Sequence, residues 1–280
     1  MQPELAQKLA HAVDSMPAFP KSVQKVIELT RNVDCTPKAL VDVIELDPVI
    51  TVKILRVANS AHYNLPKQVT SLGHAIVYLG FNTVKNLSLS IAAIGVLPKT
   101  NTADFDIQKY LIHSLSTATI AKRLAALSRQ ADPMDCFIAG LLHDFGKIVL
   151  LQFMPIEFKM ALTVCKTDNI PFNAALIGTA GVDHALVGAM LAEKWRFSAE
   201  LVTTIRHQRV DDLQDTGMTA CVFAANQISK KLEIGFGGNH LFDEFPPSVK
   251  ARLGGTLDES VALLGDMDSI IAESTLLAQL

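Results

Sequence analysis

The sequence predicts an all-α protein, and two observations carry that prediction. Apolar residues recur with a helical period in nearly every segment, whereas the strict alternation typical of strands is almost absent. Several helix starts are also marked by a capping side chain followed by proline, which loses no hydrogen bond at the first helical position. We expect two lobes: an N-terminal helical bundle over residues 1–100 and a second helical lobe over residues 101–255, followed by a C-terminal amphipathic helix over residues 256–280.

In the N-terminal lobe, local residues mark where helices begin and end. Thr36-Pro37 and Asp47-Pro48 each place an N-cap before a proline. Asn59-Ser60 comes at the end of the second of these helices, where its side chains would satisfy the last carbonyls or the next amides. Gly80 suits the position just after a helix end. These signals predict a bundle of about five helices.

The second lobe repeats the same devices. Asp132-Pro133 opens a helix and Ser198 caps a later one. A polar break at residues 98–106 separates the lobes, and the glycine-rich residues 235–247 form a loop.

The tail, Thr256–Leu280, starts with a capping box formed by Thr256 and Glu259. Its apolar residues fall on one side of a helix: Leu257, Val261, Leu264, Met267, Ile270, Ile271, Leu276 and Leu277. We expect this stripe to dock on the preceding lobe. The alternative is that part of it contacts a signalling partner or a second copy of the chain.

Composition excludes several classes of function. The chain has 280 residues, of which 49% are hydrophobic, and a net charge of −3, so it buries a substantial core and lacks the basic surface of a nucleic-acid binder. We expect Lys122-Arg123 and Lys230-Lys231 to lie on solvated helix faces. The sequence shows neither a signal peptide nor an apolar run long enough for a membrane span, and its four cysteines have no metal-binding spacing. These features predict a cytoplasmic protein without a membrane or nucleic-acid partner.

An adjacent pair, His143-Asp144, stands inside an apolar helical run that reads Ala-Gly-Leu-Leu-His-Asp-Phe-Gly-Lys from residue 139. Burying these two groups costs free energy unless both have partners. Imidazole and carboxylate together ligate a divalent metal ion, and His113, His184 and His207 offer further ligands. The alternative is a set of core polar residues satisfied by hydrogen bonds.

Four strings in series resemble the HDOD family of bacterial domains, which is related to HD-type metal-dependent phosphohydrolases and to HD-GYP phosphodiesterases. They are Met16–Pro20, Asp47–Tyr63, Ala75–Gly80 and Leu141–Gly146, which match the family pattern in order and in approximate spacing. The resemblance covers most of residues 12–230. It implies an HD-type helical fold and a signalling or regulatory role.

The resemblance also implies roles for particular residues. His113 corresponds to the first metal ligand, His143 and Asp144 to the HD pair, and His184 and His207 to further ligands. The metal would be Fe or Mn rather than Mg, and the site need not hold one. If the site is active, Asp144 and Lys147 would be its catalytic residues, with Lys147 contacting a phosphate oxygen or neutralising the carboxylate.

The sequence departs from the HD-GYP pattern at three places. Gln208 stands where an adjacent second histidine is expected, Asn226 replaces the distal aspartate, and residues 210–215 lack the glycine- and proline-bearing string. Losing an anionic ligand weakens metal binding and raises the pKa of bound water. We therefore expect a signalling protein that acts through protein contacts or self-association, with a degenerate metal site. The alternatives are an active metal-dependent phosphohydrolase and a purely structural helical adaptor.

Overall fold

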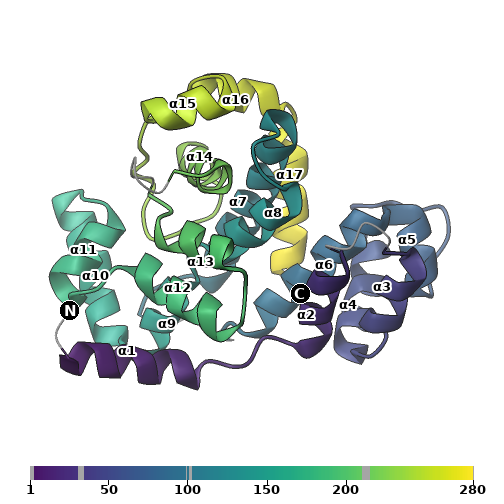
Figure 1. Cartoon of the computed structure of the whole chain (residues 1–280), viewed down its shortest axis with the longest axis horizontal. Coiled ribbons are helices and arrows are strands. Elements are labelled where there is room, and N and C mark those ends of the chain that lie inside the picture. Colours follow the sequence, from purple (N-terminus) through teal and green to yellow (C-terminus); the bar gives the residue numbers. More distant parts are fainter. Residues whose placement is uncertain (1–2, 31–34, 99, 101–102, 210–214, 280) are drawn as a thin grey trace. The chain divides into compact units, whose positions relative to one another are not determined.

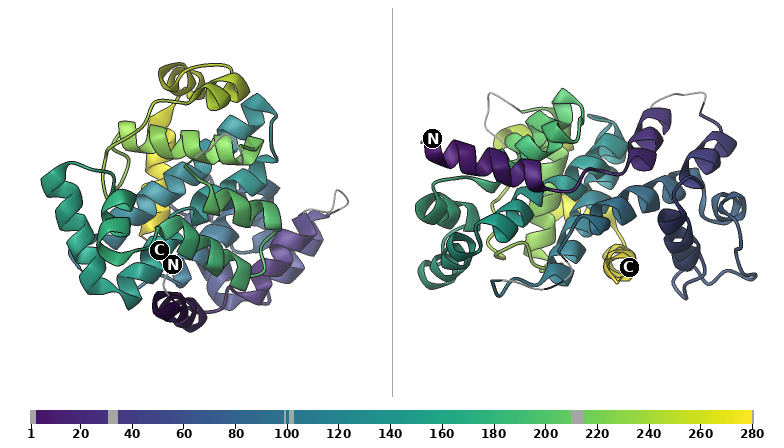
Figure 2. Two further views of the ribbon diagram at one scale, coloured as in Figure 1. Left: turned by 60° about the vertical axis from the view of Figure 1, so that its left-hand side comes forward. Right: turned by 90° about the horizontal axis from the view of Figure 1, so that it is seen from below.

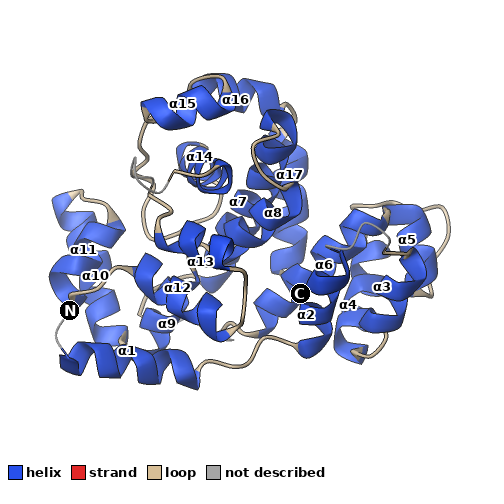
Figure 3. Ribbon diagram, in the orientation of Figure 1, coloured by secondary structure: helices blue, strands red, loops and turns tan. Residues whose placement is uncertain are grey.

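The computed structural model describes residues 3–30, 35–98, 100, 103–209 and 215–279, and within them it is built of helices without a β-strand (Figures 1 and 3). The predicted all-α class is confirmed. Most of the residues at 210–215, where the HD-GYP string is missing, lie outside the described part of the chain. Contacts divide the chain into two compact units, Met1–Met16 with Leu97–Ser274 (unit 1) and Pro17–Val96 with Thr275–Leu280 (unit 2).

Unit 2 is a bundle whose helix starts are those that the sequence marks. It contains α2 (Lys21–Thr30), α3 (Pro37–Ile44), α4 (Pro48–Ala58), α5 (Leu72–Leu79) and α6 (Phe81–Gly95). The Thr36 and Asp47 side chains accept hydrogen bonds from the first amides of α3 and α4, as predicted. Asn59 ends α4 by donating to the Leu55 carbonyl, and its side chain also forms two hydrogen bonds with the backbone of Val69. This one amide therefore fixes the loop between α4 and α5.

Unit 1 carries the remaining helices around one long, buried helix, α7. They are α1 (Pro3–Ser15), α7 (Ile107–Ser128), α8 (Pro133–Leu142), α9 (Phe145–Phe153), α10 (Pro155–Asp168), α11 (Phe172–Ala180), α12 (His184–Lys194), α13 (Ala199–Arg206), α14 (Gly217–Lys231), α15 (Pro247–Leu253), α16 (Leu257–Leu264) and α17 (Met267–Ala278). Helices α8 and α14 pack on α7, and α12 packs on α9 (Figure 2). The core of unit 1 thus lies along α7, α8 and α9.

Two glycines allow close approaches between helices in unit 1. A Cβ atom on Gly140 of α8 would lie 2.8 Å from the Ala118 Cα atom of α7, and one on Gly146 of α9 would lie 1.9 Å from the His184 carbonyl oxygen of α12. Both contacts are with backbone, so neither neighbour is free to swing away. The spacing of α7 to α8 and of α9 to α12 is therefore set by the absence of a side chain.

Helix α1 belongs to unit 1, which differs from the predicted N-terminal lobe of residues 1–100. It packs against α9 and α12. The Lys194 ammonium group donates to the carbonyls of Val13, Asp14 and Met16 at 2.9, 2.7 and 2.8 Å. A cation at the carbonyl end of a helix satisfies acceptors that have no partner within the helix. This attachment depends on residues nearly two hundred positions apart, which local patterns do not reveal.

The tail forms two helices, so the prediction of a single helix over residues 256–280 is wrong. The predicted capping box of Thr256 and Glu259 opens α16. The break comes at Gly265, whose φ of 71° lies outside the helical region, and the Asp266 side chain then accepts from the Asp268 and Ser269 amides to start α17. Most of α17, up to Ser274, belongs to unit 1, and the residues after it to unit 2.

One stretch of the described residues, Pro133–Phe153, is long and apolar enough by composition to cross a membrane, although the sequence predicts none. It comprises α8 and α9, and 89% of it is buried inside the protein. Burial of this kind is typical of a core helix, so the stretch is weak evidence for a membrane span.

Candidate metal centre

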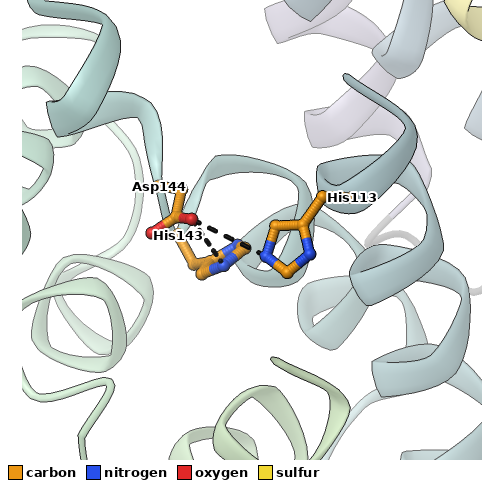
Figure 4. Close-up of side chains that lie close together, drawn as sticks. All are labelled: His113, His143 and Asp144. Atoms are coloured by element: carbon orange, nitrogen blue, oxygen red, sulfur yellow. Dashed lines mark ion pairs between the residues drawn. The ribbon is translucent and has the colours of Figure 1, made fainter. Parts of the chain in front are cut away.

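Three side chains from two neighbouring parts of unit 1 meet in the core. His113 comes from the first half of α7, His143 ends α8, and Asp144 is the residue between α8 and α9 (Figure 4). One ligand atom from each lies within 4.8 Å of the other two. The Asp144 Oδ2 atom is 3.3 Å from His143 Nε2 and 3.7 Å from His113 Nε2. All three residues are at most 1% exposed.

A hydrogen bond on the side of the ring away from Asp144 fixes the orientation of His143. Its Nδ1 atom lies 2.6 Å from the Gly140 carbonyl oxygen, and because a carbonyl only accepts, Nδ1 carries the proton. The Nε2 atom therefore presents a lone pair towards Asp144 Oδ2. Neither His143 Nε2 nor His113 Nε2 has a hydrogen-bond partner in the described structure, although both are buried. Buried lone pairs that face a carboxylate oxygen fit a cation, so these residues suit a metal ion.

His184 approaches the other oxygen of the same carboxylate. Its Nε2 atom lies 3.1 Å from Asp144 Oδ1, and its Nδ1 atom lies 3.2 Å from the Asp183 carboxylate. Asp183 also caps α12 and pairs with Arg209. A carboxylate behind an imidazole orients the ring and raises its basicity, as in many metal sites. His184 therefore contacts the carboxylate of the cluster from its other side, although it lies outside the group of three residues whose ligand atoms are mutually close.

Lys147 already supplies a positive charge at the centre. Its Nζ atom donates to Asp144 Oδ2 at 2.6 Å and to the Gly237 carbonyl at 2.5 Å. The side chain is 5% exposed. Of the two roles that the family resemblance suggests, the contact seen here is neutralisation of the carboxylate. Lys147 thus shares the Oδ2 atom of Asp144 with His113 and His143.

Burial and charge set the protonation states. Burial lowers the pKa of His113 to about 3 against the opposing charge of Asp144, and it also lowers the pKa of His184. Burial alone would raise the pKa of Asp144, but the neighbouring His143 ring and Lys147 ammonium group hold it well below its ordinary value. Near neutral pH the carboxylate is therefore ionised, and His113 and His184 are neutral, which are the metal-binding forms.

The remaining predicted residues lie around this cluster. His207 is half-buried at the end of α13, outside the three-residue group described above, and its role as a ligand stays a prediction. Gln208 is buried and donates to the main-chain carbonyls of His143 and Ile205 at 2.7 and 3.2 Å. The side chain that replaces a histidine therefore supports the HD pair. Asn226 is buried in α14, and its Oδ1 atom has no hydrogen-bond partner in the described structure.

Two contributors to the site were not predicted from the sequence. Lys230 is half-buried rather than on a solvated face, and burial together with the charge of Lys147 lowers its pKa to about 8. Lys122, the other lysine expected on a solvated helix face, is also half-buried, and burial lowers its pKa.

The second contributor is Gly237, where a Cβ atom would lie 2.8 Å from a ring carbon of His113 and 3.1 Å from Asp144 Oδ2. The glycine-rich string was visible in the sequence, but its place over the cluster was not.

The fold is that of a known family. The HDOD domain model matches residues 16–210, so the chain belongs to the HDOD domain family, as its motifs predict. An uncharacterised protein of Treponema pallidum is 30% identical over 206 residues, which cover 72% of this chain and 39% of that protein. The chain therefore spans about two fifths of the length of this curated relative.

Solved structures support the same assignment. An HDOD domain protein of unknown function from Geobacter sulfurreducens has a TM-score of 0.80 at 26% identity, with 99% of this chain and 96% of that one covered. A candidate signal transduction protein from Marinobacter aquaeolei has a TM-score of 0.78 at 24% identity, covering 98% of this chain and 66% of the other. A candidate phosphohydrolase from Shewanella amazonensis has a TM-score of 0.73 at 24% identity, with 97% of both chains covered. The last two similarities establish the fold alone.

Proposed function

We propose that this chain is a cytoplasmic signalling domain that acts through protein contacts, and that its HD-type cluster binds a divalent metal ion without rapid turnover of a phosphate ester. The observation that carries the proposal is the closure of the site. The cluster residues are buried, and Gly237 packs directly on His113 and Asp144. In the metal-free protein the backbone at Gly237 leaves no room for a phosphate ester beside His113 and Asp144.

The ligand set favours the same conclusion. Asp144 is the only carboxylate among the predicted ligands, and Lys147 shares its charge. Gln208 uses its amide to hold the His143 carbonyl and so is not free to activate water. Asn226 stands where the family pattern has its distal aspartate, so the site lacks a second negative charge. A metal held mainly by neutral imidazoles polarises bound water less than one held by several carboxylates.

His113, His143 and Asp144 would hold the metal, with His184 completing the set. Imidazole-rich sites suit Fe better than Mg, which prefers oxygen ligands, and the family resemblance adds Mn as the second candidate. When bound, such an ion supplies Lewis acidity and positive charge. The chain's own residues orient it: Gly140 and Asp183 fix the rings, and Gln208 holds the backbone of the pair.

Unit 2 offers a surface for protein contacts. Four large apolar side chains on or beside α4 and α5 are exposed: Leu46 (71%), Val49 (63%), Val52 (64%) and Val77 (77%). The two helices contact each other. Several exposed apolar side chains on adjacent helices are typical of an interaction site rather than of ordinary surface. We propose that this face binds a signalling partner or a second copy of the chain.

The alternative is a metal-dependent phosphohydrolase, and the convergence of His113, His143 and Asp144 favours it. Purification without chelator, metal analysis and a screen of phosphomonoesters, phosphodiesters and cyclic dinucleotides with Mn²⁺ or Fe²⁺ separates the two. We expect turnover far below about 1 per second, equal in wild type and Asp144→Ala. Faster turnover that Asp144→Ala abolishes would show that the protein is an enzyme.

The contact surface needs its own experiment. We expect in-cell cross-linking of wild type to give a defined adduct, either with another protein or with a second copy. The double variant Val52→Glu with Val77→Glu should lose that adduct. Leu263→Glu is the matched control, because Leu263 is a similarly exposed apolar residue in unit 1 (59%), and it should keep the adduct. Equal adducts in both variants would reject this face as the interface.

A further inference from the structure

The loop between α14 and α15 is attached to the metal centre by one lysine. We call residues 235–246 the glycine loop. Its outer anchors are the Phe236 amide, which donates to the Lys109 carbonyl at 2.9 Å, and the Asp243 amide, which donates to the Gln227 side chain at 2.8 Å. Between these anchors, the Gly237 carbonyl accepts from Lys147. The loop therefore has two fixed ends and a middle held through the side chain that neutralises Asp144.

The middle of the loop and a metal ion would need the same space. A Cβ atom on Gly237 would lie 3.0 Å from His113 Nε2 and 3.1 Å from Asp144 Oδ2, the atoms that face each other in the candidate site. An ion bound to these atoms carries ligands of its own on its open side. Gly237 lies against His113 Nε2 and Asp144 Oδ2, so it would occupy space that such ligands need.

The positive charge of Lys147 also opposes the binding of a divalent ion at Asp144. The Lys147 ammonium group lies 2.6 Å from Asp144 Oδ2, the oxygen nearest to both imidazole lone pairs. A divalent ion on that oxygen would stand within a few ångströms of the ammonium group, in a buried site where repulsion is poorly screened. Lys230 adds a further positive charge close to Lys147. One carboxylate does not hold both cations.

We propose that Lys147 is an internal cation that occupies Asp144 when no metal is bound, and that binding of a divalent ion displaces it, breaks its bond to Gly237 and releases the glycine loop. The proposal rests on the metal-binding part of the proposed function. Phe236, Gly238, Asn239, His240 and Leu241 of the loop line a surface cavity of 840 Å³. Metal binding at the buried centre would thus change the shape of this cavity on the surface of unit 1.

Hydrogen–deuterium exchange with Mn²⁺ as the probe tests the release directly. In the wild-type protein, Mn²⁺ should speed exchange of the loop amides between the two anchors, at residues 237–242, and leave α7 and α8 unchanged. Loop exchange that stays constant or slows over the whole Mn²⁺ titration would overturn the proposal. This measurement needs no variant and no enzymatic activity, so its outcome is independent of the turnover screen.

The variant Lys147→Met tests the competition, because methionine keeps the length of the side chain without its charge. We expect its loop to exchange fast without metal, and its Mn²⁺ affinity by calorimetry to exceed that of wild type by about tenfold or more. Lys166→Met is the matched control, since Lys166 is an exposed lysine that lines the cavity without reaching Asp144, and it should behave like wild type. Unchanged or weaker Mn²⁺ binding by folded Lys147→Met would disprove the competition. If this variant does not fold, the wild-type exchange experiment still decides.

Discussion

The side-chain amide of Gln208 donates to the main-chain carbonyl of His143 across 2.7 Å, within the buried interior of unit 1. Gln208, which stands where the family pattern has a second histidine, therefore supports the His143-Asp144 pair, which matches that pattern. The hydrogen bond reaches the turn between α8 and α9, where His143 and Asp144 take their orientation.

Replacing Gln208 with alanine should lower the free energy of unfolding by about 1–3 kcal/mol, because the His143 carbonyl would be left buried without this partner. Metal affinity should fall by roughly tenfold or more, since the ligands stay but their support is lost. Urea unfolding and calorimetry measure the two effects. Gln152→Ala removes an exposed glutamine of α9 and should change stability by less than about 0.5 kcal/mol. Equal stability of the two variants would contradict the support role.

A methyl group at Gly146 should be among the most damaging small changes in unit 1. Its Cβ atom would lie 1.9 Å from the His184 carbonyl oxygen, so α9 and α12 must separate. We expect Gly146→Ala to cost at least about 2 kcal/mol. Gly178→Ala is the control, because a Cβ atom there meets open space in α11, and it should stabilise the helix by up to about 1 kcal/mol. Thermal melts of both variants suffice, and equal melting temperatures would refute the close contact.

Stability without metal should fall as the solution becomes acidic. The pKa of His113 drops from 6.5 to about 3 on folding, so below pH 6.5 the unfolded chain takes up a proton that the folded chain refuses. Stability is therefore full above that pH and decreases towards pH 3 by up to about 1.4 kcal/mol per pH unit, with His184 adding in the same direction. Asp144 adds a further loss below its ordinary pKa of 3.8, because its folded-state pKa is depressed.

Urea unfolding in the presence of a chelator, from pH 8 to pH 4, measures this slope. His113→Gln should flatten it, whereas His11→Gln, at an exposed position of α1, should leave it as in wild type. A stability maximum near pH 4–5 would be the opposite sign and would disprove the assignment.

The tail should prove part of the fold. Leu257 is fully buried, Ile270 is 1% exposed, and Arg123 of α7 donates to the carbonyls of Leu264 and Asp266 at 3.3 and 3.4 Å. Truncation after residue 255 should therefore cause unfolding or aggregation. Within α16, Leu257→Ala should cost about 2–5 kcal/mol, and Leu263→Ala, at an exposed position, close to nothing. A truncated protein that stays folded but loses a partner would identify the tail as an interface.

Features encoded by neighbouring residues could be read from the sequence. The Thr36, Asp47, Asp132 and Ser198 caps and the capping box at Thr256 all appear as predicted. Each depends on a side chain and an amide two or three positions away, so the pattern contains both partners. The break at Gly265 was missed because the apolar stripe continues through it, and only the backbone conformation shows that the helix stops.

The candidate site was predictable in its residue types but not in its surroundings. The HD pair and the flanking histidines carry a recognisable motif, and the structure brings His184 within 3.1 Å of Asp144. The bond from Lys147 to the Gly237 carbonyl joins residues 90 positions apart and involves a backbone acceptor, which every residue possesses. No pattern of side chains marks such an acceptor. The attachment of α1 by Lys194 was not predictable for the same reason, because its acceptors are also backbone carbonyls.

The glycines at positions 140 and 146 stand on either side of the His143-Asp144 pair, and each brings two backbones together without a side chain between them. The dimensions of the centre are therefore held by main-chain contacts, which no exchange of ligands disturbs. Point substitutions at the ligand positions change what the centre binds while leaving its size intact. The backbone framework therefore keeps its geometry when side chains change. Carboxylates could be introduced at the ligand positions of this centre by substitution, without redesign of the helix packing around them.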